Sequence, residues 1–171
     1  MSALTRRLEP KRLAVVALSA VLAVGGWEAW RVLGPRPLVN VPKIVTDFGH
    51  QKVIYHLTES GGYLGQKHRN WLSNMENHFA ALEPGELDLV VVMNGDGVDL
   101  LSHARSDEKI AARIDALKAR GARFLVCRNT LISRGIDPDK DLHGVATADL
   151  IGAGVAQIAL LERQGYGYLK P

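Results

Sequence analysis

From about residue 50 to the C-terminus, apolar positions follow two alternating spacings. Short runs rich in valine, leucine and isoleucine predict strands, because a strand of a covered parallel sheet is apolar on both faces. Stretches with apolar residues at three- and four-residue steps predict amphipathic helices. The predicted strands are residues 52–57, 87–93 and 122–127, with a short final strand at 166–169.

Three helices are predicted to separate these strands, and turn or capping residues mark their ends. They are a helix over residues 66–82 that ends before Pro84-Gly85, a helix capped by Ser106 that ends at Gly121, and a helix opening at Thr147 or Asp149 and ending at Gly165. Residues 131–146 are less regular, with a short element predicted around 142–145. Strands that alternate with helices predict an α/β domain over residues 50–171, with a mostly parallel sheet and helices on both faces.

The N-terminal part of the chain has the pattern of an export signal. Residues 1–12 are basic, and residues 13–24 (LAVVALSAVLAV) are uncharged and almost wholly apolar. Residues 1–33 therefore predict either a cleaved signal peptide or an uncleaved hydrophobic helix that anchors the protein, with Trp27 and Trp30 near the membrane surface. Both interpretations stay open. Either one keeps the N-terminus in the cytoplasm and, in a bacterium, puts the domain on the periplasmic side of the inner membrane.

Residues 34–49 predict an extended linker, because three prolines fall within 34–43. The charge of the chain is also concentrated before this linker. Of 21 Lys and Arg and 18 Asp and Glu, residues 1–12 hold four basic residues and one acidic residue, so the rest of the chain is neutral. A nucleic-acid partner is not expected, because phosphate binding needs a concentrated basic face.

Cys127 is the single cysteine of the chain. A lone cysteine excludes an intrachain disulfide and every multi-cysteine zinc or iron–sulfur site, and no metal is expected. The thiol is either a small buried apolar group or a reactive nucleophile. A reactive thiol needs nearby positive charge or backbone N–H donors, which a helix starting near Asn129-Thr130 would supply.

Polar residues follow three of the predicted strands at their carboxyl ends, where an open α/β sheet binds ligands. The candidate catalytic residue is Cys127, and the candidate binding residues are His56, Asn94, Asp96, Arg128 and Asn129. His56 is interpreted either as a base or charge partner or as a histidine of the core or rim. Asn94 and Asp96 also fit a tight turn.

Four segments together resemble the DsrE/DsrF-like family of sulfur-relay proteins. They are KVIYHLT at 52–58, ELDLVVVMNGDGVDLL at 86–101, ARFLVCRNTL at 122–131 and GVAQIALLERQGYGYLKP at 154–171. The most specific piece is a strand ending in Cys-x-Asn-Thr/Ser-Leu, matched by Cys127, Asn129, Thr130 and Leu131.

The resemblance implies a flavodoxin-like domain that assembles as a trimer or hexamer. It also implies that Cys127 carries sulfur as a persulfide, without a cofactor, and exchanges it with a thiol-bearing donor or acceptor protein. The chain would then act as a sulfurtransferase. The alternative is a non-catalytic, membrane-tethered oligomeric binding module with the same fold.

Overall fold

The computed structural model describes residues 41, 42, 44 and 46–171, of which Thr46–Pro171 form a compact unit. Residues 1–33, predicted to be a signal peptide or an anchoring helix, and most of the predicted linker lie outside the described residues. The elements in chain order are β1 (Gln51–Leu57), the 3₁₀-helix η1 (Tyr63–Gly65), α2 (Gln66–Ala81), β2 (Leu87–Met93), the 3₁₀-helix η2 (Gly95–Val98), α3 (Asp99–Ala104), α4 (Glu108–Ala119), β3 (Arg123–Cys127), α5 (Arg128–Arg134), α6 (Pro138–Asp141), the 3₁₀-helix η3 (Thr147–Asp149), β4 (Leu150–Ile151), α7 (Gly154–Arg163) and β5 (Gly167–Leu169).

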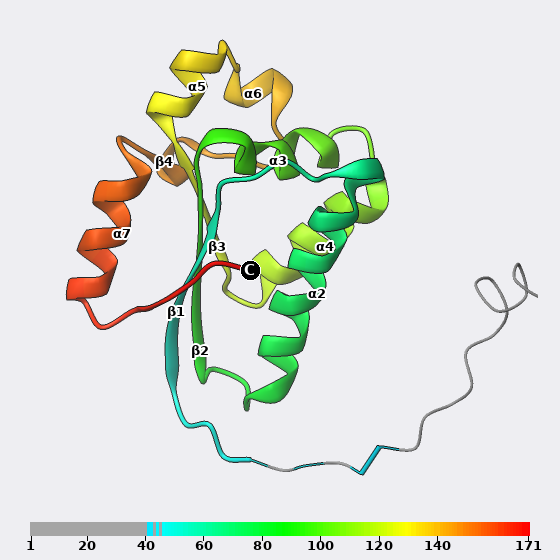
Figure 1. The fold of residues 1–171 in the computed structure, drawn as a ribbon, viewed down its shortest axis with the longest axis vertical. Coiled ribbons are helices and arrows are strands. Elements are labelled where there is room, and N and C mark those ends of the chain that lie inside the picture. Colours follow the sequence, from blue (N-terminus) through cyan, green and yellow to red (C-terminus); the bar gives the residue numbers. More distant parts are fainter. Residues whose placement is uncertain (1–40, 43, 45) are drawn as a thin grey trace, which may run out of the picture. The chain divides into compact units, whose positions relative to one another are not determined.

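The five strands form one parallel sheet in the order β4-β3-β2-β1-β5 (Figure 1). β2 lies in the middle, and all its side chains except that of Asp88 are buried, as its valine-rich sequence predicts. The chain moves in one direction from β1 to β4 and then crosses back to place β5 beside β1. The predicted α/β fold with a flavodoxin-like parallel sheet is thus confirmed.

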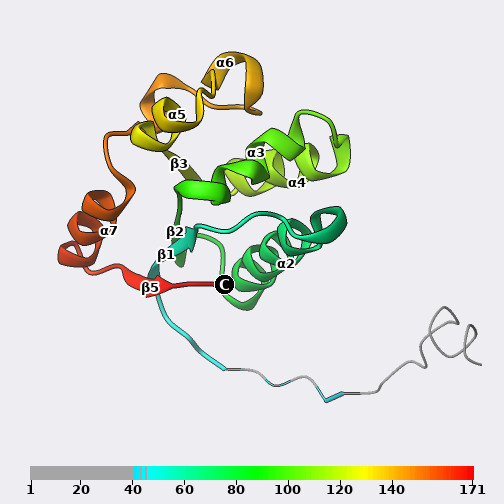
Figure 2. The same ribbon diagram turned by 45° about the horizontal axis from the view of Figure 1, so that its top comes forward.

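This strand order decides which face each helix covers. Crossovers between parallel strands are right-handed, so a reversal of direction along the sheet sends the connecting helix to the opposite face. Helices α2, α3 and α4 follow β1 and β2 and lie on one face, whereas α7 follows β4 and lies on the other (Figures 1 and 2). The connections after β3 and β4 therefore leave toward opposite faces, and the sheet has its topological switch point between these two strands.

Each face of the sheet has its own apolar core. The larger core joins alternate strand residues such as Val91 and Phe124 to the apolar faces of α2 and α4, which include Leu72, Met75 and Ile114. The smaller core packs α7 on the opposite face of the central strands; its buried members are Ile54, Val90, Val92, Leu125, Ile158, Leu161 and Tyr166. Burial of each such aliphatic side chain contributes about 1.5–3 kcal/mol.

Several predicted boundaries were wrong. The N-cap of α4 is Asp107, not Ser106, because the Asp107 carboxylate accepts from the N–H groups of Lys109 and Ile110. The last helix begins at Gly154, not at Thr147 or Asp149. The segment assigned to its first turns instead forms η3 and the short strand β4.

The region predicted to be irregular is partly helical, since α5 and α6 occupy residues 128–134 and 138–141, while no helix or strand forms at 142–145. α3 was also not predicted. Its start is fixed by a close backbone approach just before it, where a Cβ on Gly97 would overlap the carbonyl group of Leu57. Glycine at this position lets η2 pack directly on the end of β1.

Candidate functional site

Side-chain alternation places three of the candidate residues on one face of the sheet. Ile54 and Leu125 face α7, so His56 and Cys127, two residues further along the same strands, also project toward the α7 face. Asn94 follows β2 and lies two residues after Val92, so its side chain is on the same face as that of Val92. The structure therefore brings His56, Asn94 and Cys127 to the carboxyl edge of one face.

Cys127 lies at the switch point itself, as the last residue of β3 and the residue before α5. The thiol is buried, with 5% of the residue exposed. The N–H of Gly154, the first residue of α7, donates to Sγ at 3.4 Å, and Sγ lies 4.0 Å from the carbonyl oxygen of Gly152. Backbone groups from the loop after β4 thus contact the sulfur at the end of β3.

The surroundings of the thiol favour its ionised form. Burial opposes ionisation, but the N–H groups of Thr130 and Gly154, the Thr130 hydroxyl and the N–H of Asn129 outweigh it, so the pKa of Cys127 lies below its ordinary value. None of these donors carries a formal charge. The thiolate is stabilised by hydrogen-bond donors, as the helix start predicted near Asn129-Thr130 implied.

Thr130 links the thiol to the loop after β2. The residue is buried, and its Oγ1 accepts a hydrogen bond from the N–H of Gly95 at 3.0 Å. Because Gly95 occupies an acceptor position of the hydroxyl, the hydroxyl proton remains available for the sulfur. Thr130 therefore acts as a donor with a fixed orientation toward Cys127.

His56 and Asn94 are directly hydrogen-bonded. Nε2 of His56 lies 2.9 Å from Oδ1 of Asn94, and Nδ1 of His56 lies 2.8 Å from the hydroxyl oxygen of Tyr168 in β5. The Asn94 side chain packs on Gly154, where a Cβ would come within 3.3 Å of the Cβ of Asn94. We call Cys127, Thr130, Asn94, His56 and Tyr168 the thiol cluster.

The other three predicted residues lie around this cluster and not within it. Asp96 is exposed and pairs with Arg134 at 3.7 Å. Arg128 and Asn129 are exposed in the first turn of α5. Among the described residues, Arg128 makes no side-chain hydrogen bond or ion pair, and Asn129 acts on the sulfur through its backbone N–H.

Sequence reasoning missed Thr130, Gly154 and Tyr168 as members of the site. The sequence could have indicated Thr130, because this residue lies in the first turn of the helix that Cys127 precedes. Gly154 carries no side chain, so its part in the site rests on its backbone N–H, which contacts the sulfur, and on its position beside Asn94. The position of Tyr168 depends on β5 lying beside β1.

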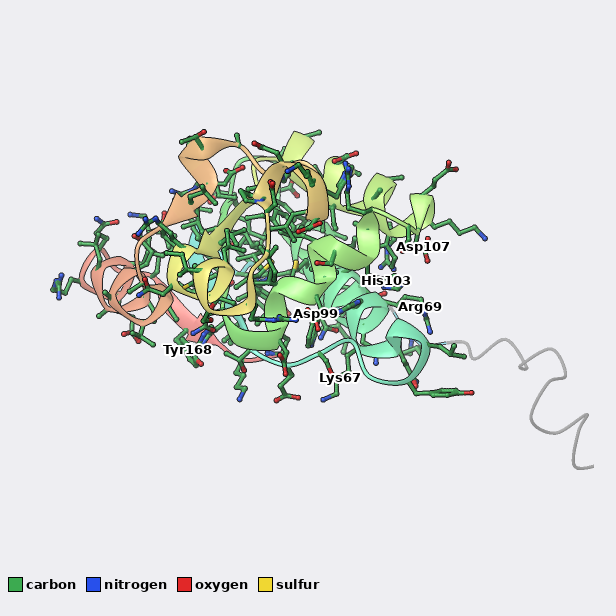
Figure 3. The ribbon with its side chains drawn as sticks, turned by 90° about the horizontal axis from the view of Figure 1, so that it is seen from above. Lys67, Arg69, Asp99, His103, Asp107 and Tyr168 are labelled. Atoms are coloured by element: carbon green, nitrogen blue, oxygen red, sulfur yellow. The ribbon has the colours of Figure 1, made fainter. Side chains whose placement is uncertain are left out.

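A second group of polar residues lies at the same edge on the opposite face, beside α2 and α3 (Figure 3). Nδ1 of His68 and Nδ1 of His103 are 3.0 Å apart, and we call these residues the histidine pair. His68 is buried, and its Nε2 is the one buried side-chain polar atom without a hydrogen-bond partner in the part of the chain that the structure describes. Burial, reinforced by His103, lowers the pKa of His68 to about 4.

An open pocket of about 620 Å³ adjoins the histidine pair. It is lined by Ser60, Gly61, Gly62, Leu64, Gly65, His68, Asp99, Ser102 and His103. Lys67 and Arg69 do not line it, since Lys67 pairs with Glu59 and Arg69 donates to the carbonyl oxygen of Leu64. A glycine-rich loop that binds phosphate usually has a basic side chain facing the bound group. Neither Lys67 nor Arg69 faces this pocket, so the loop after β1 lacks that feature.

Over the described residues, no cluster of three or more histidine, cysteine, aspartate or glutamate side chains is arranged to hold a metal ion. Within the same part of the chain, no helix combines the length and apolar character needed to cross a bilayer.

Comparison with known proteins identifies the family. The model of the DsrE/DsrF-like family matches residues 52–171. A solved structure of a protein of unknown function from Methanobacterium thermoautotrophicum is similar, with 30% sequence identity and a TM-score of 0.58 over 71% of this chain and 99% of that chain. Among curated proteins, none matches. The family match covers more than half of the chain and its whole folded unit, and the chain therefore belongs to the DsrE/DsrF-like family.

Proposed function

We propose that this protein is a sulfur-relay protein in which Cys127 carries sulfane sulfur as a persulfide and passes it to a partner thiol. Membership of the DsrE/DsrF-like family supports a sulfur-relay role in general. The observation that carries the finer proposal is the convergence of uncharged donors from α5 and α7 on a thiol at the switch point of the sheet. This arrangement stabilises a thiolate, the nucleophilic form of cysteine.

The proposed reaction has two steps of the same kind. The Cys127 thiolate attacks the outer sulfur of a donor persulfide R–S–SH, the Sγ–S bond forms, the donor S–S bond breaks, and R–S⁻ leaves, giving Cys127–S–SH. An acceptor thiolate R′–S⁻ then attacks the outer sulfur of Cys127–S–SH, giving R′–S–SH and restoring the Cys127 thiolate. Neither step involves a net oxidation or reduction, so the proposed reaction needs no cofactor.

Two features of Cys127 suit this carrier role. No second cysteine exists in the chain to trap the persulfide as an intrachain disulfide. The residue is 5% exposed, which favours a slender group such as a terminal sulfur over a bulky electrophile. A thiol-bearing donor or acceptor protein is the partner in this proposal, and residues 1–33 tether or export the domain on the periplasmic side of the inner membrane.

The exposed apolar side chains of α7 and β5 support the further proposal that the chain forms a homo-oligomer. They are Val155, Leu160, Tyr168 and Leu169, with 40–67% of each residue exposed. These elements adjoin the thiol cluster. A non-catalytic oligomeric binding module would use the same surface, and the reactivity of Cys127 distinguishes the two functions.

The direct test uses the domain without residues 1–33, loaded with inorganic polysulfide and weighed intact. The expected result is a gain of one sulfur atom that is lost when a small thiol is added. The control is Cys127→Ala, which should gain none. Absence of this gain in the unsubstituted domain, together with slow alkylation of the thiol at neutral pH, would instead support the binding module.

A further inference from the structure

We infer that the side-chain amide of Asn94 contacts the sulfur atom that Cys127 accepts, and that His56 and Tyr168 are positioning residues that orient this amide. The inference rests on the proposed function and deepens it, because it names a residue that recognises the transferred atom. It is carried by hydrogen bonds and packing contacts among the members of the thiol cluster.

The first step concerns the orientation of the Asn94 amide. Its Oδ1 lies 2.9 Å from Nε2 of His56, and an amide oxygen can only accept. Nε2 of His56 must therefore carry a proton, which leaves Nδ1 of a neutral His56 to accept from the Tyr168 hydroxyl at 2.8 Å. A protonated His56 would still donate to Oδ1. In both states the oxygen of Asn94 is engaged, and its NH₂ group has no hydrogen-bond partner among the described residues.

The second step concerns where this NH₂ group lies. Nδ2 of Asn94 is 3.5 Å from the position that a Cβ on Gly154 would occupy. The N–H of the same glycine is 3.4 Å from Sγ of Cys127. The amide and the sulfur thus lie beside the same residue, and because Gly154 has no side chain, none fills the space next to the amide.

The third step concerns the chemistry of the transferred atom. A persulfide places its outer sulfur about 2 Å beyond Sγ. When this sulfur ionises, it is an anion that hydrogen-bond donors stabilise, and the backbone donors described above already act on Sγ itself. The Asn94 NH₂ group supplies a hydrogen-bond donor for the outer sulfur of the persulfide. An amide does not titrate in this pH range, so its role is contact and not proton transfer.

The test measures the pH at which the loaded persulfide ionises. The domain is loaded with inorganic polysulfide, and its alkylation by iodoacetamide is followed by intact mass from pH 5 to 9. Asn94→Leu should raise the proton affinity of the persulfide about tenfold, because a hydrogen bond to a charged group is lost. His56→Leu should raise the proton affinity of the persulfide by a similar factor, because the Asn94 amide loses the hydrogen bond that orients it. His56→Gln, which can still donate to Oδ1, should stay within about twofold of the unsubstituted domain.

Two controls make the result decisive. Alkylation of the unloaded thiol should change less than threefold in Asn94→Leu, because Asn94 is not among the donors to Sγ. The second control needs no variant and therefore holds even if one fails to fold. The side-chain ¹⁵N–¹H signal of Asn94 in the unsubstituted domain should shift when sulfur is loaded. An unchanged persulfide titration in Asn94→Leu, or an unmoved Asn94 signal, would overturn the inference while leaving sulfur carriage intact. Failure to load any sulfur would overturn the proposed function itself.

Discussion

At the carboxyl edge of the sheet, the thiol cluster and the histidine pair lie on opposite faces and differ in how their buried polar atoms are satisfied. Sγ of Cys127 is surrounded by hydrogen-bond donors, and the pKa of its thiol is lowered despite burial. Nε2 of His68 has no partner, and burial lowers the pKa of its imidazole to about 4. Hydrogen-bond donors therefore outweigh burial for the thiol on one face, whereas burial is left uncompensated for the imidazole on the other.

The difference follows from which charge each group would carry. A thiolate is an anion, and backbone N–H groups at the start of α5 and α7 point at it. An imidazolium is a cation, and its nearest partner is another imidazole, which disfavours a second proton. The same edge of the fold thus favours the anionic form of a thiol on the α7 face and the neutral form of a histidine on the α2 face.

The largest expected effect comes from Gly97, which lies against the end of β1 at the carboxyl edge of the sheet. In Gly97→Ala, a Cβ would overlap the backbone of Leu57 and force apart the ends of β1 and η2. We expect a loss of about 3 kcal/mol in the free energy of unfolding, the upper end of the usual range for overpacking, because the Cβ meets backbone that cannot rotate away. Urea denaturation measures it. The matched control is Gly152→Ala, where a Cβ meets no atom within 4 Å; equal stability of the two variants would contradict the close approach.

The next effect belongs to the histidine pair alone. Because the pKa of His68 is about 4 when folded and about 6.5 when unfolded, the unfolded chain binds the proton more readily between these values. Its contribution to stability is complete above pH 6.5 and is lost as the pH falls toward 4, by an amount on the order of 3 kcal/mol.

Urea midpoints at pH 7 and at pH 4.5 test this loss. His68→Gln should reduce the difference between the two pH values, whereas His50→Gln, at an exposed position, should preserve it. A pH dependence that is the same in His68→Gln as in the unsubstituted domain would show that the acid sensitivity arises elsewhere.

A smaller effect is expected in the thiol cluster when a single donor is removed. Thr130→Val keeps the shape of the side chain but deletes its hydroxyl, so the pKa of Cys127 should rise and alkylation at neutral pH should slow roughly fivefold. Thr130→Ser should restore most of the rate. If valine and serine variants react equally fast, the donor is not the hydroxyl and the backbone N–H groups alone account for the thiolate.

Sequence periodicity predicted those parts of the fold that bury a full apolar face. β1, β2, β3, α2 and α4 appear within a few residues of their predicted bounds, because each contributes several side chains to a core. The start of α7 was misplaced because Ile151 and Val155 continue a helical spacing. Ile151 belongs to the two-residue strand β4, and Val155 is exposed.

Only those residues of the candidate site that lie at the carboxyl ends of long strands could be predicted from the sequence. His56, Asn94 and Cys127 follow from the rule that ligands collect at the carboxyl edge of a parallel sheet. The contacts of Cys127 with Gly154, and of His56 with Tyr168, join residues that are distant in the chain. They depend on β4 lying beside β3 and β5 beside β1, and nothing in a two- or three-residue strand specifies its neighbour.

The most direct measurement compares sulfur uptake at the two regions. The domain is treated with inorganic polysulfide and weighed intact as the unsubstituted form, as Cys127→Ala and as His103→Asn. We expect one added sulfur in the unsubstituted form and in His103→Asn, and none in Cys127→Ala. Equal sulfur uptake in Cys127→Ala and the unsubstituted form, or no uptake in either, would contradict the assignment of Cys127 as the sulfur carrier.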